Sequence, residues 1–234
     1  MFLLYININK NIFSNNNKIA FLFLIYDEIN HEEIWKHFFN KYKLDNIIPT
    51  TYYDISLVKA HNLLLEEALK DENNTHFILL SNSCIPFKNF NYIYYHLDNN
   101  FSYYNMCYDT LYERTTYALK YITKSEIKKA HQWAILNKKH ATILIDDKNK
   151  YINWFTQCPD EHSHITYLFY KKLDNEIIKT NNSKYDATTF TNWDHNGLKN
   201  YDYIDTNELL LLYKSPCFFG RKFIKNCKNL DLLY

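Results

Sequence analysis

Ile19-Ala-Phe-Leu-Phe-Leu-Ile25 is a continuous apolar stretch, and it decides the fold of this chain. The stretch is short and rich in residues that favour strands, so it predicts a buried strand rather than a helix. His76-Phe-Ile-Leu-Leu80 predicts a second buried strand further along the chain.

Helical patterns follow these two strands. Apolar residues recur at helical spacing between Asn30, a candidate N-cap, and about Tyr42. They do so again between Ser56, a second candidate N-cap, and about Leu69. Residues 90–97 have the pattern of a further short helix. The order strand, helix, strand, helix indicates an α/β protein with a parallel sheet.

The second half of the chain predicts further elements. In order, we expect a strand over 101–107, a long loop over 110–125, a helix from about 137 to 147, a helix from 159 to about 173, a charged loop over 174–184, a strand and turn over 190–195 and a helix over 208–213. Asp146 and Asp147 then lie at a helix end, where we expect them to be solvated.

Polar residues follow both buried strands. In parallel α/β sheets, ligands bind outside the carboxyl ends of the strands. Tyr26 and Asp27 follow the first strand, and Ser81-Asn-Ser-Cys84 follows the second. These residues are therefore candidates for a binding site; the alternative is that 81–84 is an ordinary polar turn.

The composition excludes several classes of function. The 234 residues carry a formal net charge of +1 and no long basic run, so nucleic acid is not an expected partner. Only 2 glycines are present, which excludes glycine-rich phosphate loops. Any phosphate must then be held by side chains or by helix N-termini. The abundance of Asn, Ile, Lys and Tyr suggests an AT-rich genome.

The cysteines and the apolar segments indicate the compartment. The 5 cysteines are an odd number and none are spaced as a metal-binding CxxC pair, so free thiols in a reducing compartment are expected. The apolar start, Met1 to Ile8, is too short to span a bilayer. We therefore expect a soluble, cytoplasmic protein with no transmembrane segment.

Cys158-Pro-Asp-Glu-His162 predicts a helix start with two acids in its first turn. Pro159 suits the first helical position, and the exposed backbone N–H groups there stabilise the charges of Asp160 and Glu161. A carboxylate held in this way stays ionised at neutral pH and can take a proton from an alcohol within hydrogen-bond reach. The alternative is that the acids only flank a helix start.

Seven segments in a fixed order resemble the core-2/I-branching glycosyltransferase family, most closely its plant-type and large-virus members. They are Lys18-Ile-Ala-Phe-Leu-Phe-Leu24, Ile48-Pro-Thr-Thr-Tyr-Tyr-Asp-Ile-Ser-Leu-Val-Lys-Ala60, His76-Phe-Ile-Leu-Leu-Ser-Asn-Ser-Cys-Ile-Pro-Phe87, His131-Gln-Trp133, Pro159-Asp-Glu-His162, Thr191-Asn-Trp-Asp194 and Ser215-Pro-Cys-Phe-Phe-Gly-Arg-Lys-Phe223. The resemblance covers residues 18–224. We read 1–17 as an N-terminal strand or linker segment and 18–234 as a single domain.

The resemblance implies a GT-A-like α/β fold with a Rossmann-type mixed sheet flanked by helices. It implies an inverting transfer of a GlcNAc-like or xylose-like sugar from a UDP-sugar to a hydroxyl of a glycan or protein acceptor. Glu161 matches the family's base. Arg221 and Lys222 match its diphosphate-binding pair, and Lys214 is a candidate second basic position.

The leaving diphosphate needs positive charge near it. The chain contains no Asp-x-Asp motif of the kind that binds a divalent metal in many GT-A enzymes. We therefore expect no metal and no other cofactor, with lysine and arginine neutralising the diphosphate. The alternative for Arg221 and Lys222 is a solvated charge pair. Ser56 and Ser83 lie on segments that the family places near the donor.

The acceptor side is expected to hold Trp133, Asp160 and Trp193. Sugar C–H groups pack well on indole faces, and core packing is the alternative for each tryptophan. The family often has Gly-Ser before its Gln-Trp, whereas Ala130 and His131 stand here. This departure raises the alternative of a catalytically inactive GT-A-like module that binds a nucleotide sugar or a glycan.

A cysteine hydrolase that uses Cys84 or Cys158 with a nearby histidine is a third, weaker alternative, since the 10 histidines make chance proximity common.

Overall fold

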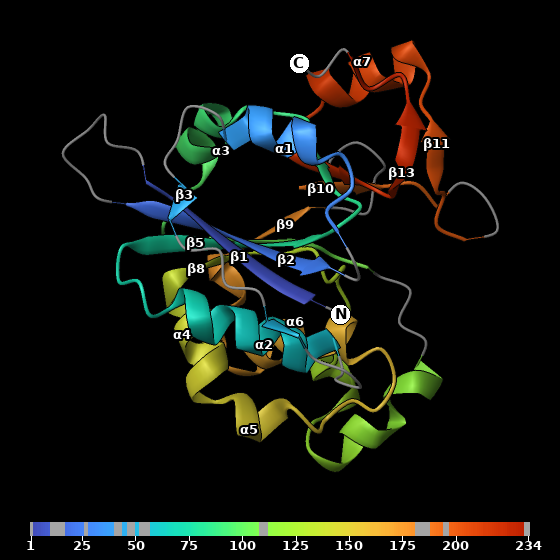
Figure 1. The fold of residues 1–234 in the computed structure, drawn as a ribbon. Coiled ribbons are helices and arrows are strands. Elements are labelled where there is room, and N and C mark those ends of the chain that lie inside the picture. The colour runs from blue at the N-terminus through green and yellow to red at the C-terminus, as the bar shows by residue number, and fades with distance from the viewer. Residues whose placement is uncertain are drawn as a thin grey trace.

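The centre of the structure is a mixed β-sheet with helices on both faces (Figure 1). The computed structural model describes residues 2–9, 17–25, 28–39, 44–45, 50–51, 57–107, 112–180, 188–193 and 197–231. Within them the main sheet has the order β3 (Leu44–Asp45), β1 (Phe2–Asn9), β2 (Lys18–Ile25), β5 (Asn74–Ser81), β8 (Ile135–Asn137), β7 (Ser102–Asn105) and β9 (Ile177–Thr180), with β4 (Thr50–Thr51) paired to β1. This architecture agrees with the expected GT-A-like α/β fold.

Strand β2 is buried on both faces, as its apolar sequence predicts. Leu22 faces a hydrophobic cluster shared with α2 (Leu57–Ala68), α4 (Lys138–Asp146) and α6 (Pro159–Tyr170). Phe21 and Phe23 face a second cluster that contains Trp35 of α1 (Glu32–Phe39). Full burial of one such side chain contributes roughly 1.5–3 kcal/mol. A slip of one residue would exchange the two sets of side chains, so the pairing of β2 with β5 is strongly specified.

The sheet is mixed rather than parallel throughout. The pairs β2–β5 and β7–β9 are parallel, but β1 is antiparallel to β2, and β8 is antiparallel to both β5 and β7. Strand β9 lies where a charged loop was expected, so that expectation was wrong for 174–180; residues 181–187 lie outside the described part. Only Ile177 of β9 is fully buried, so its sequence carries little strand pattern.

Helices cover the two faces unequally (Figure 1). One face carries α2 (Leu57–Ala68), α4 (Lys138–Asp146), α5 (Lys148–Tyr151) and α6 (Pro159–Tyr170), and the other carries α1 (Glu32–Phe39) and α3 (Phe90–His96). Asn89 caps α3 and Asn137 caps α4, because each side chain accepts a hydrogen bond from the backbone N–H three residues later.

Three local expectations need correction. Asn30 does not cap α1; its Nδ2 donates to the carbonyl oxygen of Phe223 at 2.9 Å. The expected loop over 110–125 contains the 3₁₀ helices η1 (Tyr112–Lys120) and η2 (Lys124–Glu126), and η3 (Asp174–Glu176) precedes β9. Asp147 is not simply solvated: hydrogen bonds from Lys150 and Tyr167 lower its pKa to about 2.

A smaller set of strands near the C-terminus positions the basic residues. The strands β10 (Thr189–Thr191), β12 (Phe219–Arg221) and β6 (Ile85–Pro86) form one sheet, and β11 (Tyr201–Tyr203) pairs with β13 (Phe223–Lys228), next to α7 (Thr206–Lys214). A Cβ atom at Gly220 would clash with the ring of Phe87, so glycine lets β12 lie against β6. Arg221 and Lys222 follow directly.

Two buried histidines should make the folded protein less stable in acid. His61 of α2 and His164 of α6 have ring centroids 6.1 Å apart. Neither ring nitrogen of His61 has a hydrogen-bond partner among the described residues. Burial lowers the pKa of His61 to about 3 and that of His164 to about 4. The unfolded chain therefore binds more protons below pH 6.5, and the free energy of unfolding should fall by up to about 1.4 kcal/mol per pH unit per histidine between pH 6.5 and 4.

Urea unfolding at several pH values between 7.5 and 4.5 measures this loss. His61→Leu should reduce the slope, because one of the two histidines is removed. An unfolding free energy that stays constant over this range in the wild-type protein would contradict the prediction.

Candidate functional site

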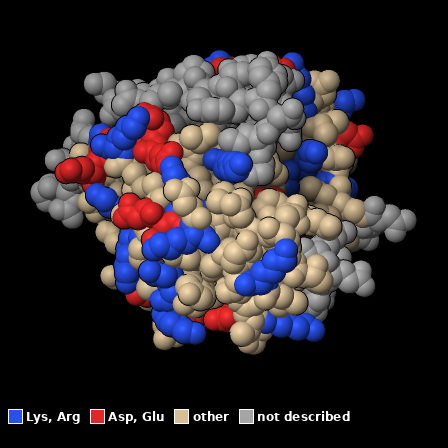
Figure 2. All heavy atoms as spheres, turned by 90° about the horizontal axis from the view of Figure 1, so that it is seen from below, with Lys and Arg blue, Asp and Glu red and all other residues tan. Residues whose placement is uncertain are grey.

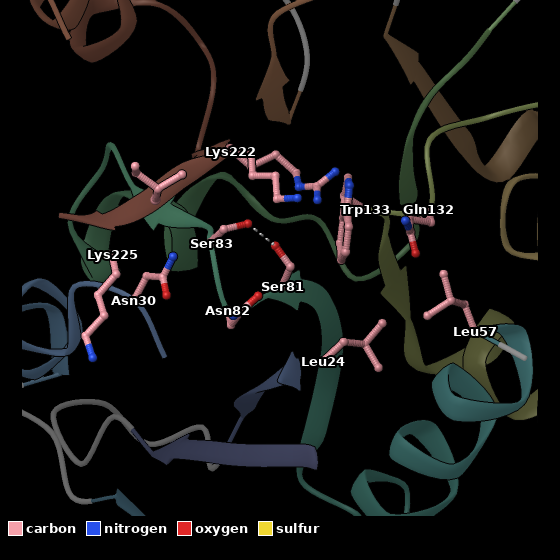
Figure 3. A pocket seen from close by; sticks show the side chains of 12 residues that line it. Leu24, Asn30, Leu57, Ser81, Asn82, Ser83, Gln132, Trp133, Lys222 and Lys225 are labelled. Atoms are coloured by element: carbon pink, nitrogen blue, oxygen red, sulfur yellow. Dashed lines mark hydrogen bonds between the residues drawn. The ribbon is translucent and has the colours of Figure 1, made fainter. Parts of the chain in front are cut away.

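A pocket of about 360 Å³ lies at the carboxyl ends of β2 and β5 (Figure 3). Segments far apart in the sequence line it: Leu24, Asn30, Leu57, Ser81, Asn82, Ser83, Gln132, Trp133, Arg221, Lys222, Ile224 and Lys225. Figure 3 shows Asn30 and Lys225 on one side of it and Leu57 on the other. Three of the lining residues are cations and none is an acid. Lys225 pairs with Glu28 outside the lining, so Arg221 and Lys222 are the cations that make the pocket suited to an anionic ligand. We call it the basic pocket.

The loop after β5 forms the floor of the basic pocket, as expected for a site at the carboxyl ends of strands. The hydroxyls of Ser81 and Ser83 are 3.0 Å apart and share a hydrogen bond. The backbone N–H of Asn82 donates to Leu24 of β2, and the N–H of Phe223 donates to Ser83. The loop is therefore joined to β2 on one side and to β13 on the other.

Arg221 and Lys222 are half-buried at the end of β12. The guanidinium carbon of Arg221 lies 4.4 Å from the centroid of a Trp133 ring. A cation held over an indole in this way gains about 0.5–2 kcal/mol, and its orientation is restricted. Trp133, which is only 4% exposed, thus packs against an arginine, although it still lines the basic pocket.

A second pocket of about 400 Å³ adjoins the first. Its lining residues are Cys107, Lys129, His131, Gln132, Trp133, Glu161, Thr191, Trp193, Leu198 and Arg221. Gln132, Trp133 and Arg221 line both pockets and so form a shared wall. We call the second one the carboxylate pocket, because Glu161 lies in it.

The segment 128–134 builds this shared wall. Its backbone lies between the end of β7 and the first turn of α6: the N–H of Ala130 donates to the carbonyl oxygen of Glu161 at 3.0 Å, and the N–H of His131 donates to that of Asn105 at 2.9 Å. These backbone hydrogen bonds therefore fix the distance between Glu161 of α6 and the side chains of segment 128–134.

Glu161 lies in the first turn of α6, which begins at Pro159 as predicted. Cys158 precedes it in the left-handed region (φ 46°), which is uncommon for a residue other than glycine. The Oε2 atom of Glu161 is 3.5 Å from Nζ of Lys129, and the Glu161 side chain is 32% exposed. The carboxylate is thus accessible from the pocket and paired with one cation.

Asp160 differs from its neighbour. Burial, and then repulsion from Glu161, raise the pKa of Asp160 to about 6. The carboxyl group is therefore still mostly ionised at pH 7, but the loss of hydration on burial raises its pKa more than the helix N-terminus lowers it. The structure places it in the lining of neither pocket.

His131, Thr191 and Trp193 line the carboxylate pocket but not the basic pocket. The indole N–H of Trp193 donates to Oγ1 of Thr191 at 3.2 Å, and that oxygen is 3.4 Å from Nδ1 of His131. Trp193 is 53% exposed, so an indole face is open to a ligand. His131 occupies space that a smaller residue would leave empty.

Other expected residues lie elsewhere. Lys214 is exposed at the end of α7 and lines neither pocket. Ser56, like Tyr26 and Asp27, lies outside the described residues. Cys84 is fully buried, and burial raises the pKa of its thiol, which argues against a cysteine nucleophile at that position.

Sequence patterns missed Lys129 and assigned no role to Gln132. Lys129 belongs to no recognisable motif, and only its place in the folded chain pairs it with Glu161. Gln132 lies within the segment His131-Gln-Trp133, and this was the only sequence feature that pointed to a role for it.

Figure 2 shows the face on the side of α4 and α5, where lysines and acids lie side by side rather than in a patch of one sign. Helix α5 contributes Lys148 and Lys150 to ion pairs with Glu66 and Asp147, respectively. No helix in the described ranges has both the length and the apolar character needed to cross a bilayer. Those ranges also bring together no group of three or more His, Cys, Asp or Glu that could hold a metal ion.

Comparison with known proteins relates this chain to an enzyme family and to a plant protein. The model of the Core-2/I-Branching enzyme family matches residues 13–227. Glycosyltransferase BC10 of rice, Oryza sativa subsp. japonica, is 34% identical over 113 residues. That alignment covers 47% of this chain and 28% of the rice protein.

Proposed function

Because the chain belongs to the core-2/I-branching enzyme family, we propose that it is an inverting glycosyltransferase that moves a sugar from a UDP-sugar to a hydroxyl of a glycan or protein acceptor. The observation that carries the proposal is the shared wall: Glu161 and Lys222 line adjoining pockets that meet at Gln132, Trp133 and Arg221. A base and a cationic pocket placed in this way suit a displacement in which the nucleophile enters from one side and a diphosphate leaves on the other.

Glu161 is the proposed base. The acceptor hydroxyl attacks the anomeric carbon, the bond from that carbon to the diphosphate oxygen breaks, and the hydroxyl proton passes to the Glu161 carboxylate. Lys129, 3.5 Å from Oε2, restricts the position of that carboxylate. Positioned proton transfer of this kind contributes typically about 10²–10⁴-fold to a rate.

Arg221 and Lys222 are the proposed partners of the leaving UDP. Both line the basic pocket, whose lining residues include no acid. Arg221 offers a planar fork to phosphate oxygens and Lys222 a point charge. The hydroxyls of Ser81 and Ser83 are further polar groups on the floor of that pocket.

The acceptor is proposed to lie in the carboxylate pocket against Trp193. Its exposed indole offers an apolar face to the C–H side of a sugar ring. His131 narrows the same pocket and so favours a slender acceptor.

Chelation tests the role given to the basic residues. Because Arg221 and Lys222 neutralise the diphosphate in this proposal and the chain has no Asp-x-Asp motif, transfer should continue in EDTA at an unchanged initial rate. The measurement is UDP release with and without EDTA, followed by addition of Mn²⁺. A strict Mn²⁺ requirement would contradict the proposed role of these cations.

A thermal-shift screen against UDP, UDP-GlcNAc, UDP-xylose and UDP-glucuronate tests the donor class, since ligands that bind the folded state raise the melting temperature. Donor hydrolysis and transfer are then measured with every UDP-sugar that shifts it. Binding without any turnover would favour the inactive binding module instead, for which Ala130 and His131 are the motivating departure. An unshifted melting temperature with all four ligands would overturn the donor assignment.

A further inference from the structure

Gln132 is a polar side chain at the junction of the two pockets, and it lines both of them. Its backbone is held on both sides. The N–H of the preceding residue, His131, donates to Asn105, and the carbonyl oxygen of Gln132 accepts from the N–H of Ala134 at 3.0 Å. Figure 3 shows its side chain beside Trp133 at the edge of the basic pocket.

The side-chain carbonyl oxygen of Gln132 is not satisfied by the described part of the chain. This Oε1 atom is buried and has no hydrogen-bond partner among the described residues. A buried carbonyl left in this state destabilises the folded chain, and such groups are uncommon in native structures. Nothing in the described chain therefore locks the amide, whose terminal torsion rotates easily, so a ligand can determine which way it points.

We propose that the Gln132 amide hydrogen-bonds a hydroxyl group of the transferred sugar and selects the donor by that contact. This inference rests on the function proposed above. The diphosphate lies with Arg221 and Lys222 on one side of the shared wall, and the acceptor hydroxyl lies with Glu161 on the other. The group that passes between them must lie next to the wall itself, where Gln132 is the uncharged side chain that can both donate and accept hydrogen bonds.

In this placement the transferred sugar and the nucleotide contact different residues. UDP alone engages the basic pocket and leaves Gln132 without a partner, whereas a UDP-sugar satisfies it. A site built to hydrogen-bond a substrate hydroxyl discriminates strongly against ligands that lack it, because its own polar group is then left unpaired.

Gln132→Met is the test, since methionine has a similar length and no hydrogen-bonding amide. Thermal shifts are measured with UDP and with the UDP-sugar that gives wild type its largest shift beyond UDP. We expect the UDP shift to be retained and the extra shift from the sugar to be lost, with about 10- to 100-fold weaker binding of the UDP-sugar. Without ligand the variant should melt no lower than wild type, because an unsatisfied buried group is removed.

Two matched variants separate the sugar contact from general effects. Gln157→Met makes the same replacement at an exposed site that lines neither pocket and should leave every shift unchanged. Tyr104→Phe removes another buried polar atom that has no partner in the described ranges, and it should raise the melting temperature without altering ligand binding.

The possible results distinguish failure of the Gln132–sugar contact from failure of the proposed function on which it rests. If Gln132→Met keeps the full extra shift from the UDP-sugar, Gln132 does not contact the sugar and the inference is overturned while the proposed function stands. If wild type responds to neither UDP nor any UDP-sugar, the proposed function fails and the inference fails with it.

Discussion

Glu161→Gln should lower kcat for sugar transfer by about 10³-fold while UDP still binds. Glutamine keeps the size of the side chain and its place in the carboxylate pocket but cannot accept the proton of an acceptor hydroxyl. The basic pocket is lined by other residues, so the affinity for UDP should change by less than about twofold. The readouts are initial rates of UDP release and a thermal-shift titration with UDP.

Glu176→Gln is the matched control. Glu176 is also a carboxylate paired with a lysine, Lys139, but it lines neither pocket. The control should keep its activity, which would show that loss of a lysine–carboxylate ion pair does not by itself lower the rate of transfer. Loss of the Glu161–Lys129 pair itself should change stability by no more than about 1 kcal/mol, because the pair is partly exposed. Full activity in Glu161→Gln would refute the assignment of the base.

Lys222→Met should lower kcat/KM by about 10²–10³-fold, the usual cost of removing one group that stabilises developing charge. Methionine keeps the unbranched stem and removes the ammonium group from the basic pocket, so the leaving diphosphate loses one of its cations. UDP affinity should fall as well, since the product carries the same diphosphate. Rates and UDP binding are measured on the same preparation.

Lys228→Met makes the same change at an exposed position on β13 that lines neither pocket. It should behave as wild type in both measurements. If Lys222→Met and Lys228→Met proved equally active, Lys222 would be a solvated surface lysine with no part in diphosphate binding.

The alternation of buried strands and amphipathic helices was predictable because each pattern is local. Strands β2 and β5 contain the continuous apolar runs 19–25 and 77–80, and the apolar residues of α2 repeat with the period of a helix. The antiparallel neighbours β1 and β8 were not predictable in the same way, because the direction of a strand depends on the connection that leads to it. Strand β9, with one fully buried residue, has too weak a pattern to be read.

The residues of the candidate site divide in the same way, into relations that are local in the sequence and contacts between distant segments. Pro159 and Glu161 both lie in the first turn of one helix, so their relation was already visible in the sequence. The ion pair between Lys129 and Glu161, and the cation–π contact between Arg221 and Trp133, join segments that no local pattern connects.

The amino-acid sequence by itself determined the α/β class, the polar loop at the end of β5 and the helix start that holds Glu161, because hydrophobic period and backbone preference act over a few residues. Only the tertiary structure decided that Gln132, Trp133 and Arg221 form one wall between two pockets. That wall depends on β12 pairing with β6 and β10, and on the backbone of 128–134 bonding to β7 and α6. Pairing of this kind is set by which distant segments bury their apolar faces together, and that choice is made by the whole chain.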